Sequence, residues 1–343
     1  MNKISARTRA WRVSDDDFYE IESRSEQLEF LLGYAILAPS GHNTQPWAFR
    51  ITDEGIEVYA DGSRAMPVVD PEERELLMSV GAAITNLRVA AAHFGFDTSV
   101  LYQPRPETSL PVALVTCSET SDPDRRLAPL FGAIKRRHTN RHAFDGGALD
   151  ARALTALCDL AGLYPETLSL LLPYFQRQTA DLVAFADRKQ MASEGFRNDV
   201  ADWIRPSGPD RLDGICADAL GVPEVASGAA AWLLRHFDIG AWRADRDRQL
   251  VTKASLLMLV SADDDRSSLV RAGEVLECLL LTITNVGLHY SFMNQPIQVN
   301  QLRDRVGTLS PCQRPPQLLL RIGHAAVVDR PMPRRSVKAV VVK

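Results

Sequence analysis

One loop of the 343-residue chain gathers side chains that can hold a polar aromatic ring. Residues 38–47 read APSGHNTQPW, so serine, asparagine, threonine and glutamine follow one another between a predicted helix and a predicted strand. These side chains and the loop amides offer hydrogen-bond donors and acceptors side by side, which suits a heteroaromatic ring that alternates N–H, C=O and N groups. The alternative is a well-bonded turn in which Trp47 anchors the core.

A second segment is the densest basic run of the chain. Residues 135–142 read KRRHTNRH, and a further pair, Arg334 and Arg335, precedes a strand-like stretch at 337–342. A guanidinium fork matches two phosphate oxygens at once, so arginines with an interposed hydroxyl predict a phosphate cradle. The alternatives are a solvated basic face and a basic tail. The net charge of −4 disfavours a general nucleic-acid binder, so we expect any anion site to be local.

The two segments together resemble the signature of a known family. The loop from Pro39 to Trp47 is similar to the Pro-Ser-x-x-Asn-x-Gln-Pro-Trp signature of the nitroreductase superfamily of FMN proteins. The Arg-x-Thr-x-Arg stretch at 137–141, followed by Ala-Phe-Asp, resembles the phosphate-binding motif of that superfamily. Most members carry the phosphate motif first and bind each FMN between two identical subunits. The reversed order found here resembles the Acg-type members, in which two nitroreductase-like halves are fused in one chain.

The resemblance implies FMN as the cofactor, with NADPH or NADH as a possible electron donor. It places the FMN phosphate near Arg137, Thr139, Arg141 and Arg334 or Arg335, and the ring against Pro39, Ser40, Asn43 and Gln45. It places Ser291, Met293, Asn294 and Gln295 on the N5 side of the ring. Simple nitroreductases tend to have a small residue beside N5, so the bulk of the stretch 293–295 predicts restricted access for a hydride. No residue is nominated as a catalytic nucleophile, a general acid or a metal ligand.

The elements that must position these residues follow from hydrophobic spacing. Apolar residues at 76, 80, 84, 87, 91 and 94 are spaced 4, 4, 3, 4 and 3, which predicts a helix closed by Gly95. A helix closed by Gly287 lies 192 positions later. We also expect a helix from Ser14 to Ala38, a hairpin at 47–59, and strands at 111–117, 167–172, 291–299 and 317–322.

The 192-residue offset indicates an internal repeat. Chance helical periodicity is the alternative. The resemblance implies that the repeats are two fused nitroreductase-like halves, residues 1–125 and 126–343, in an α+β fold with a mixed or antiparallel sheet packed with helices in each half. Where the first half needs a phosphate motif it has a single arginine, Arg24, between two acids, and the second half has no Asn-x-Gln-Pro-Trp loop. Each half keeps one portion of a site, so we expect one FMN per chain, as in a pseudo-dimer.

The second half is also longer than the first. Arg137 precedes Gly273 by 136 positions, against 57 between Arg24 and Gly81, so about 79 residues are extra. Residues 185–250, where turn formers interrupt short amphipathic pieces, account for most of them. Their position predicts a lid over the flavin; the alternative is a helical subdomain with no role at the site.

Two functions follow from these features. The first is an NAD(P)H-dependent oxidoreductase that reduces small-molecule electron acceptors such as nitroaromatics or quinones. The second is an FMN-binding or storage protein whose lid leaves little turnover. The fusion predicts a monomer or a weak homo-oligomer. The N-terminus lacks an apolar signal region, no run reaches the roughly 18 apolar residues of a membrane span, and the five cysteines are widely spaced, so we expect a cytoplasmic protein with reduced thiols and no membrane partner.

Overall fold

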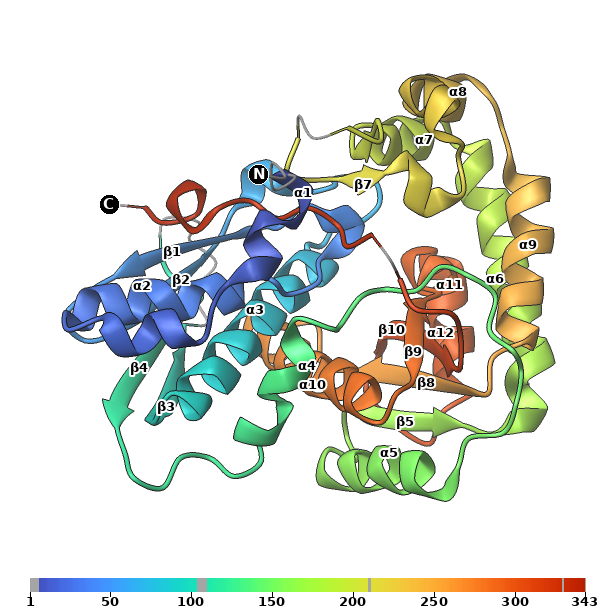
Figure 1. The fold of residues 1–343 in the computed structure, drawn as a ribbon. Helices are drawn as coiled ribbons and strands as arrows, with labels where there is room; N and C mark the ends of the chain where they lie inside the picture. The colour runs from blue at the N-terminus through green and yellow to red at the C-terminus, as the bar shows by residue number, and fades with distance from the viewer. Residues whose placement is uncertain (1–5, 104–109, 209–210, 329, 343) are drawn as a thin grey trace.

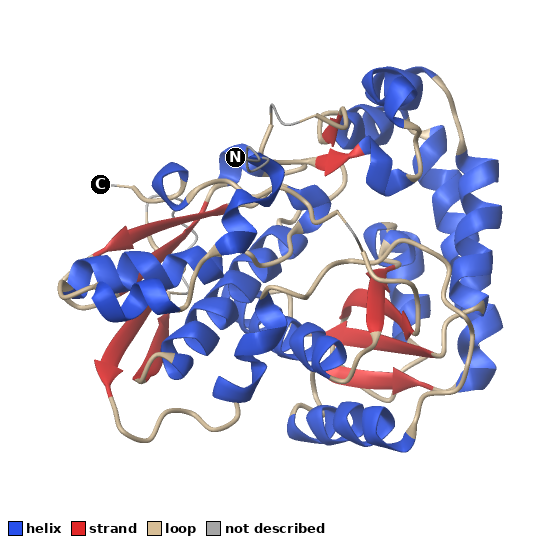
Figure 2. Cartoon of the chain, in the orientation of Figure 1, coloured by secondary structure: helices blue, strands red, loops and turns tan. Residues whose placement is uncertain are grey.

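The computed structural model describes residues 6–103, 110–208, 211–328 and 330–342 (Figure 1). Its helices are α1 (Ala6–Arg9), α2 (Arg24–Ala35), α3 (Arg74–His93), α4 (Phe131–Ile134), α5 (Ala151–Leu163), α6 (Gln176–Ala192), α7 (Glu194–Ala201), α8 (Ala230–His236), α9 (Gly240–Thr252), α10 (Arg266–Asn285), α11 (Gln295–Gln298) and α12 (Asn300–Gly307). Its strands are β1 (Trp47–Ile51), β2 (Ile56–Ala60), β3 (Phe96–Tyr102), β4 (Ala113–Glu119), β5 (Leu168–Leu171), β6 (Ile204–Arg205), β7 (Ile215–Cys216), β8 (Leu256–Ser261), β9 (His289–Phe292) and β10 (Pro316–Gly323). The fold is a mixed α+β architecture, as predicted (Figure 2).

Two antiparallel sheets of four strands share one strand order. The first runs β1-β2-β4-β3, and the second runs β5-β8-β10-β9. In each sheet the long helix that precedes the outermost strand, α3 before β3 and α10 before β9, lies between the two sheets (Figure 1). The sheets therefore correspond strand for strand along the chain.

The two long helices cross at a pair of glycines. A Cβ on Gly81 would lie 2.0 Å from the carbonyl oxygen of Val270, and a Cβ on Gly273 would lie 2.1 Å from that of Met78. Both contacts join residues that correspond at the 192-residue offset, so they mirror each other. Each helix is followed by a glycine with positive φ, Gly95 at 83° and Gly287 at 77°, as is common after a helix end.

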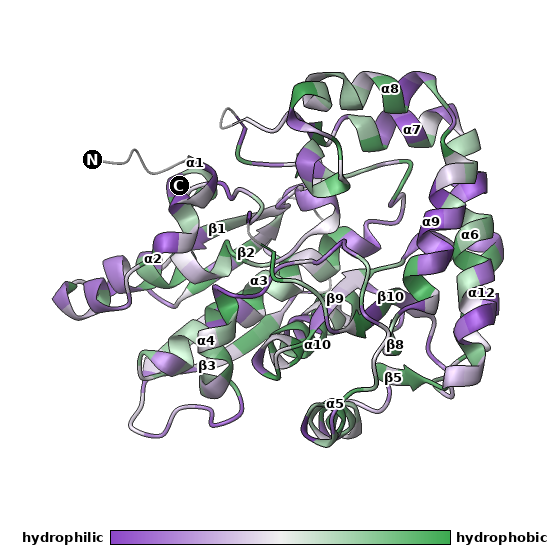
Figure 3. Cartoon of the chain, turned by 45° about the vertical axis from the view of Figure 1, so that its right-hand side comes forward, coloured by the Kyte–Doolittle hydropathy of each residue, from purple (hydrophilic) through white to green (hydrophobic). Residues whose placement is uncertain are grey.

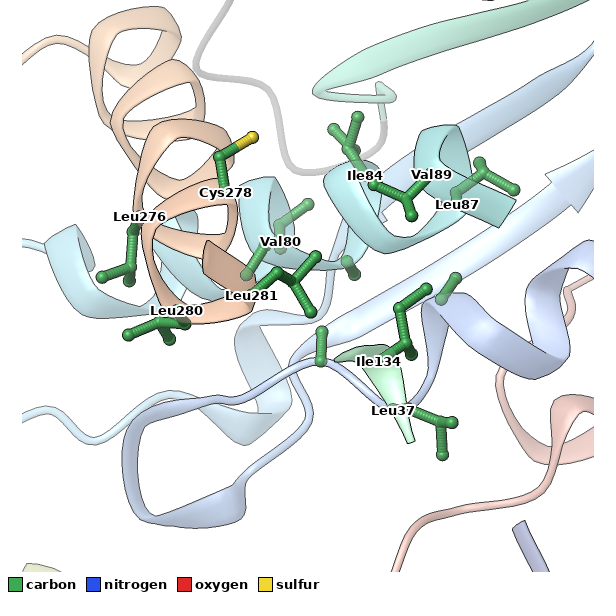
Figure 4. Packing of buried hydrophobic residues seen from close by; sticks show 14 of the residues in the cluster. Leu37, Val80, Ile84, Leu87, Val89, Ile134, Leu276, Cys278, Leu280 and Leu281 are labelled. Atoms are coloured by element: carbon green, nitrogen blue, oxygen red, sulfur yellow. The ribbon is translucent and has the colours of Figure 1, made fainter. Parts of the chain in front are cut away.

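The main hydrophobic core is continuous across both sheets. It includes Val80 and Ile84 of α3 and Leu280 and Leu281 of α10, and Val80 and Leu281 lie side by side between the two helices (Figure 4). Helix α3 is long and apolar enough to span a membrane by length and composition, but it is the almost fully buried helix at the centre of this core. The core thus joins the two halves into one packed unit.

Two smaller hydrophobic cores hold the segment between β5 and β8. Helices α6 and α9 pack along each other, and α7, α8 and the short parallel pair β6 and β7 close over them at one end. Helix α9 is largely hydrophilic (Figure 3), whereas a cluster that includes Met191, Phe196 and Val200 is buried beneath α8. The predicted insertion at 185–250 falls within this helical segment, which begins earlier, at Gln176.

The helix expected from Ser14 is wrong in its first half. The structure has a 3-10 helix at Asp16–Glu20, extended backbone at Ile21, and then α2. The carboxylate of Asp15, in the expected first turn of the helix from Ser14, is bonded to later residues: its Oδ1 accepts hydrogen bonds from the Tyr34 hydroxyl and the Lys135 ammonium, each at 2.6 Å. Tertiary contacts therefore hold this stretch where the prediction expected a regular helical turn.

Two other predicted strands are shorter than expected. The stretch 291–299 leaves the sheet after Phe292 and forms α11, with Pro296 in its first turn. The stretch 337–342 begins with a 3-10 turn at Val337–Ala339 and pairs with β1 only at a parallel bridge between Phe49 and Val341. The prediction also missed β3, which the structure places at the edge of the first sheet.

Candidate functional site

Two adjoining cavities bring most of the predicted site residues together. A smaller, basic cavity of about 250 Å³ is lined by Arg137, Thr139, Arg141 and Arg334. A larger cavity of about 620 Å³ is lined largely by apolar side chains. Pro39, Ser40, Thr139 and Arg141 line both cavities. The polar loop and the basic run, about a hundred residues apart in sequence, therefore meet where the cavities join.

Arg141 lies at this junction with its guanidinium uncommitted. Among the residues that the structure describes, its side chain makes no hydrogen bond or ion pair, and only its main-chain oxygen accepts a bond, from Arg246. Burial lowers the pKa of Arg141, and the charge of Arg246 lowers it further. A desolvated guanidinium without a carboxylate is costly, so an anion bound beside Arg141 would be strongly favoured.

Arg334 enters the basic cavity from the C-terminal segment. Its Nη1 donates to Asn43 Oδ1 at 2.8 Å, its Nη2 donates to the Leu37 carbonyl at 3.2 Å, and its Nε has no partner. Burial and the neighbouring Arg137 lower its pKa to about 9. Arg335 does not line either cavity: its guanidinium bonds the carbonyls of Gln45 and Ala339. Of the basic pair, only Arg334 is placed to bind an anion.

The guanidinium of Arg137 is bonded to groups in the protein interior. Its Nε lies 3.2 Å from Glu277 Oε1, its Nη1 donates to the Tyr290 hydroxyl at 2.5 Å, and its Nη2 donates to the Leu37 carbonyl at 2.8 Å. The side chain is 1% exposed, although it lines the basic cavity. Arg137 therefore fixes the loop around Thr139 more than it offers free donors to a ligand.

The polar loop is held in an unusual backbone conformation. His42, Asn43 and Gln45 have positive φ of 47°, 57° and 54°. The turn is held by hydrogen bonds from Asn43 N to the Ser40 carbonyl at 3.0 Å and from Gln45 N to Ser40 Oγ at 2.9 Å. Such conformations cost about 1–3 kcal/mol each for residues with a side chain and cluster at binding sites.

Two loop side chains tie the loop to distant segments. Asn43 Nδ2 donates to the Gly214 carbonyl at 2.9 Å, and Gly214 N donates back to the Asn43 carbonyl at 3.1 Å. Gln45 Nε2 donates to the Leu212 carbonyl at 2.7 Å, and its Oε1 accepts from Arg335 N at 2.8 Å. Gln45 lines neither cavity, so the structure gives it a role in joining segments, whereas Asn43 lines the basic cavity.

The end of β9 and the residues that follow it form one wall of the larger cavity. Ser291, Met293, Asn294 and Gln295 all line it. Asn294 Nδ2 donates to Glu75 Oε1 at 3.2 Å, and Gln295 Nε2 donates to Asp247 Oδ2 at 2.9 Å. Both amides are thus engaged by carboxylates, while Gln295 Oε1 has no partner.

Several residues at the site were not predicted from the sequence. His138 lines the basic cavity, and burial together with the charges of Arg137 and Arg334 lowers its pKa to about 3. His42 lines the larger cavity with Nδ1 unpartnered, and burial, Arg243 and Arg141 lower its pKa to about 4. Both rings are therefore neutral. Each lies inside a predicted motif, so its position in the motif was the available signal.

Arg321 is a further site residue that no motif indicated. It comes from β10, is fully buried, and lines the larger cavity. It donates to the carbonyls of Asn140 and His142, and two of its nitrogens have no partner. No group of three or more His, Cys, Asp or Glu side chains suited to a metal ion occurs in the described ranges. All five cysteines lie in those ranges and are free thiols.

Glu75 gives the larger cavity a titratable group. Its Oε1 accepts from Gln298 at 2.7 Å as well as from Asn294, and burial together with the Asp70 carboxylate raises its pKa to about 7. Because the folded pKa lies above the ordinary 4.5, protonated Glu75 stabilises the fold below about pH 4.5, and this contribution is lost as the pH rises toward 7.

We expect Glu75→Gln to become more stable relative to the natural protein as the pH rises from about 5 to about 8, because glutamine cannot ionise. Urea unfolding at several pH values measures the difference in the free energy of unfolding. The matched control is Glu72→Gln, three residues earlier with a side chain 55% exposed, whose difference should stay constant. Stability curves that run parallel for Glu75→Gln and the natural protein would contradict the assignment.

Comparison with known proteins tests the predicted resemblance to nitroreductases. No protein-family model matches the chain. It is 29% identical over 331 residues to "Putative NAD(P)H nitroreductase Rv3131" of Mycobacterium tuberculosis, covering 92% of this chain and 91% of that protein. It is 25% identical over 318 residues to "Putative NAD(P)H nitroreductase acg" of the same organism, covering 89% and 92%. The predicted similarity to nitroreductases, including Acg, is thus confirmed over most of the chain.

One solved structure that is also named a putative nitroreductase is similar to this chain. It is the crystal structure of a "putative nitroreductase" from Anabaena variabilis, with 11% sequence identity, a TM-score of 0.46, and coverage of 95% of this chain and 93% of that one.

Proposed function

We propose that the protein is an FMN-dependent oxidoreductase that accepts electrons from NADPH or NADH and passes them to a small-molecule acceptor in the cytoplasm. The observation that carries this proposal is the junction of the two cavities, where the uncommitted Arg141 meets Thr139, Pro39 and Ser40. The basic cavity suits a phosphate, and the larger cavity suits a flat ring. The names of the mycobacterial relatives support the same reaction class.

The residues present fit an FMN molecule lying across this junction. Arg141 and Arg334 would donate to the phosphate, and Thr139 lines both cavities between them. Ser40, Met293 and Asn294 would bound the ring. FMN, once bound, supplies the two-electron redox chemistry, and the chain supplies orientation and a water-poor environment. No side chain is required as a nucleophile or as a metal ligand.

We infer that the two halves of the chain are diverged copies of one unit, residues 1–125 and 126–343. The shared strand order, the mirrored glycine contacts of α3 and α10, and the equivalent glycines after both helices support this. Only one combination of polar loop and basic run meets at a cavity junction in the described part of the chain, as a pseudo-dimer with one retained site would have. Such a chain needs no second copy to complete the site, and a monomer or a weak homo-oligomer follows.

A storage function is the second candidate, and one observation favours it. Residues 211–214 are bonded to the polar loop through Asn43 and Gln45. Arg64 adds to this link, because it pairs with Asp213 at 2.5 Å and donates to the Thr44 carbonyl of the loop. Residues 190–250 also line much of the larger cavity. A lid tied down in this way would cover the ring and hinder both NAD(P)H and the acceptor.

We expect the purified protein to bind one FMN per chain. Absorbance of cofactor released by heat, divided by protein concentration, measures the ratio. A ratio of two would contradict the single-site argument, and a chain that cannot be loaded with FMN would contradict the proposed function itself.

We expect NADPH or NADH to bleach the FMN absorbance of the holoprotein in anaerobic rapid mixing. Rapid bleaching, followed by reoxidation when menadione or nitrofurazone is added, supports the oxidoreductase. Bleaching that is absent over minutes with both nucleotides supports storage. Dithionite, which reduces flavin chemically, is the control that shows the bound cofactor is reducible.

A further inference from the structure

The larger cavity has two chemically different ends. Its polar end is built by Ser40, His42, Thr139 and Arg141, beside the basic cavity. Its other end is walled by side chains of the segment 196–250, among them Val200, Leu220, Val222, Leu234 and Ile239. These aliphatic side chains all come from outside the two motifs. The cavity therefore extends beyond the residues that would bound a flavin ring, into apolar space.

The two cations that segment 196–250 contributes to the larger cavity, Arg243 and Arg246, are already paired with carboxylates. Arg243 Nε lies 3.4 Å from Asp187, and Arg246 Nη1 lies 3.2 Å from Asp247. Both carboxylates are buried. Uncommitted guanidinium nitrogens line the larger cavity elsewhere, on Arg141 and Arg321. An anionic ligand group would find no free partner among the described residues of the apolar end.

The apolar wall continues to the protein surface. Leu233, Phe237 and Trp242 line the cavity and are nevertheless 45%, 52% and 59% exposed. Large side chains with that much exposure in one place usually mark a binding surface. They give an uncharged, apolar molecule a path from the surface into the cavity.

We propose that the larger cavity binds an amphipathic acceptor, a quinone-type ring that carries an uncharged alkyl chain, with the chain lying against residues 196–250. The ring would face the polar end, and the chain would occupy the apolar end and the exposed mouth. This inference rests on the proposed function for the fate of the ring: a hydride from reduced flavin and a proton from solvent convert the quinone to the hydroquinone. The binding of the alkyl chain requires no electron transfer.

The test measures affinity against chain length. 1,4-Benzoquinones with methyl, propyl, hexyl and decyl side chains are titrated into the FMN-loaded protein, and quenching of tryptophan fluorescence gives Kd. Each buried methylene should lower Kd about threefold to fourfold until the cavity is filled. A Kd that does not depend on chain length would overturn the proposal, and so would equally tight binding of a quinone with a sulfonated ring.

A matched pair of variants tests where the alkyl chain of the quinone binds. Ala230 lines the cavity, whereas Ala229, the residue before it, does not. Ala230→Phe should weaken decyl-quinone binding at least tenfold and leave methyl-quinone binding unchanged, and Ala229→Phe should change neither. Equal effects of both variants would overturn the placement. Circular dichroism and thermal melts check that both variants are folded.

The failure of this inference is distinguishable from that of the proposed function. A protein that binds no FMN but shows the chain-length dependence would contradict the proposed function and retain the lipophilic site. A protein that binds FMN and is reduced by NADPH, but is indifferent to chain length, would contradict only the lipophilic site.

Discussion

Replacing Arg141 with alanine is expected to weaken FMN binding by about 10- to 100-fold while leaving the fold at least as stable as before. The loss of affinity follows from removing the proposed charged hydrogen bonds to the FMN phosphate, which contribute about 1.5–3 kcal/mol each. Stability is retained because no hydrogen bond or ion pair to this guanidinium occurs among the described residues, and removing a buried, unpaired charge does not cost stability. Equilibrium titration of the apoprotein with FMN gives the affinity, and a thermal melt of the apoprotein gives the stability.

Arg136→Ala is the matched control within the same basic run. Its guanidinium bonds the Gly132 carbonyl and the Asn285 side chain and does not line either cavity, so FMN affinity should stay unchanged. Arg137→Ala is a poor control, because it leaves Glu277 buried without its partner, and breaking such pairs costs about 3–5 kcal/mol. FMN affinity that survives Arg141→Ala would contradict the phosphate assignment.

Replacing Gly81 with alanine is expected to destabilise the protein by about 3 kcal/mol or more. The new Cβ would lie 2.0 Å from a backbone oxygen of α10, and neither helix backbone can move aside without opening the core between the sheets. Gly273→Ala should have a similar effect, since its Cβ would lie 2.1 Å from a backbone oxygen of α3. Urea unfolding, or the yield of soluble protein when folding fails, measures the loss.

Gly162→Ala is the control for a helical glycine with free space around it. It lies in α5, where a Cβ would meet nothing within 4 Å, so alanine should stabilise the protein by about 0.5–1 kcal/mol. The double variant of Gly81 and Gly273 should be less destabilised than the sum of the two, because one separation of the helices relieves both contacts. Gly81→Ala with natural stability would contradict the close crossing.

Short sequence patterns predicted the elements that are stabilised by residues close by in the chain. The apolar spacing of α3, the hairpin around Gly55 and the glycines that follow α3 and α10 all have their signals within a few residues. The predictions failed where more distant residues decide. Asp15 is held by Tyr34 and Lys135 where the first turn of a helix was expected, and β3 is held in the sheet by its pairing with β4, which follows it in the chain.

For the candidate site, too, the sequence predicted some features and missed others. The two motifs identified residues that the fold brings to one junction, including Ser40, Thr139 and Arg141. They did not reveal which side chains the protein interior had already engaged: Arg137 by Glu277, and Gln45 by main-chain groups. Residue type indicates that a group can bind phosphate, but only the three-dimensional partners decide whether it is free to do so. Arg321 belongs to no motif at all.

The C-terminal segment has a consequence for the order of events during synthesis. Arg334 completes the basic cavity by bonding Asn43, and the main chain at 340–342 exchanges two hydrogen bonds with Phe49 in the first strand, each at 2.8 Å. The residues that finish the site are thus translated after those they pack against, which lie nearly three hundred positions earlier. Until residues 334–342 have been synthesised, the chain lacks both the Arg334 guanidinium and the main-chain pairing with Phe49, so the basic cavity cannot be complete before that point.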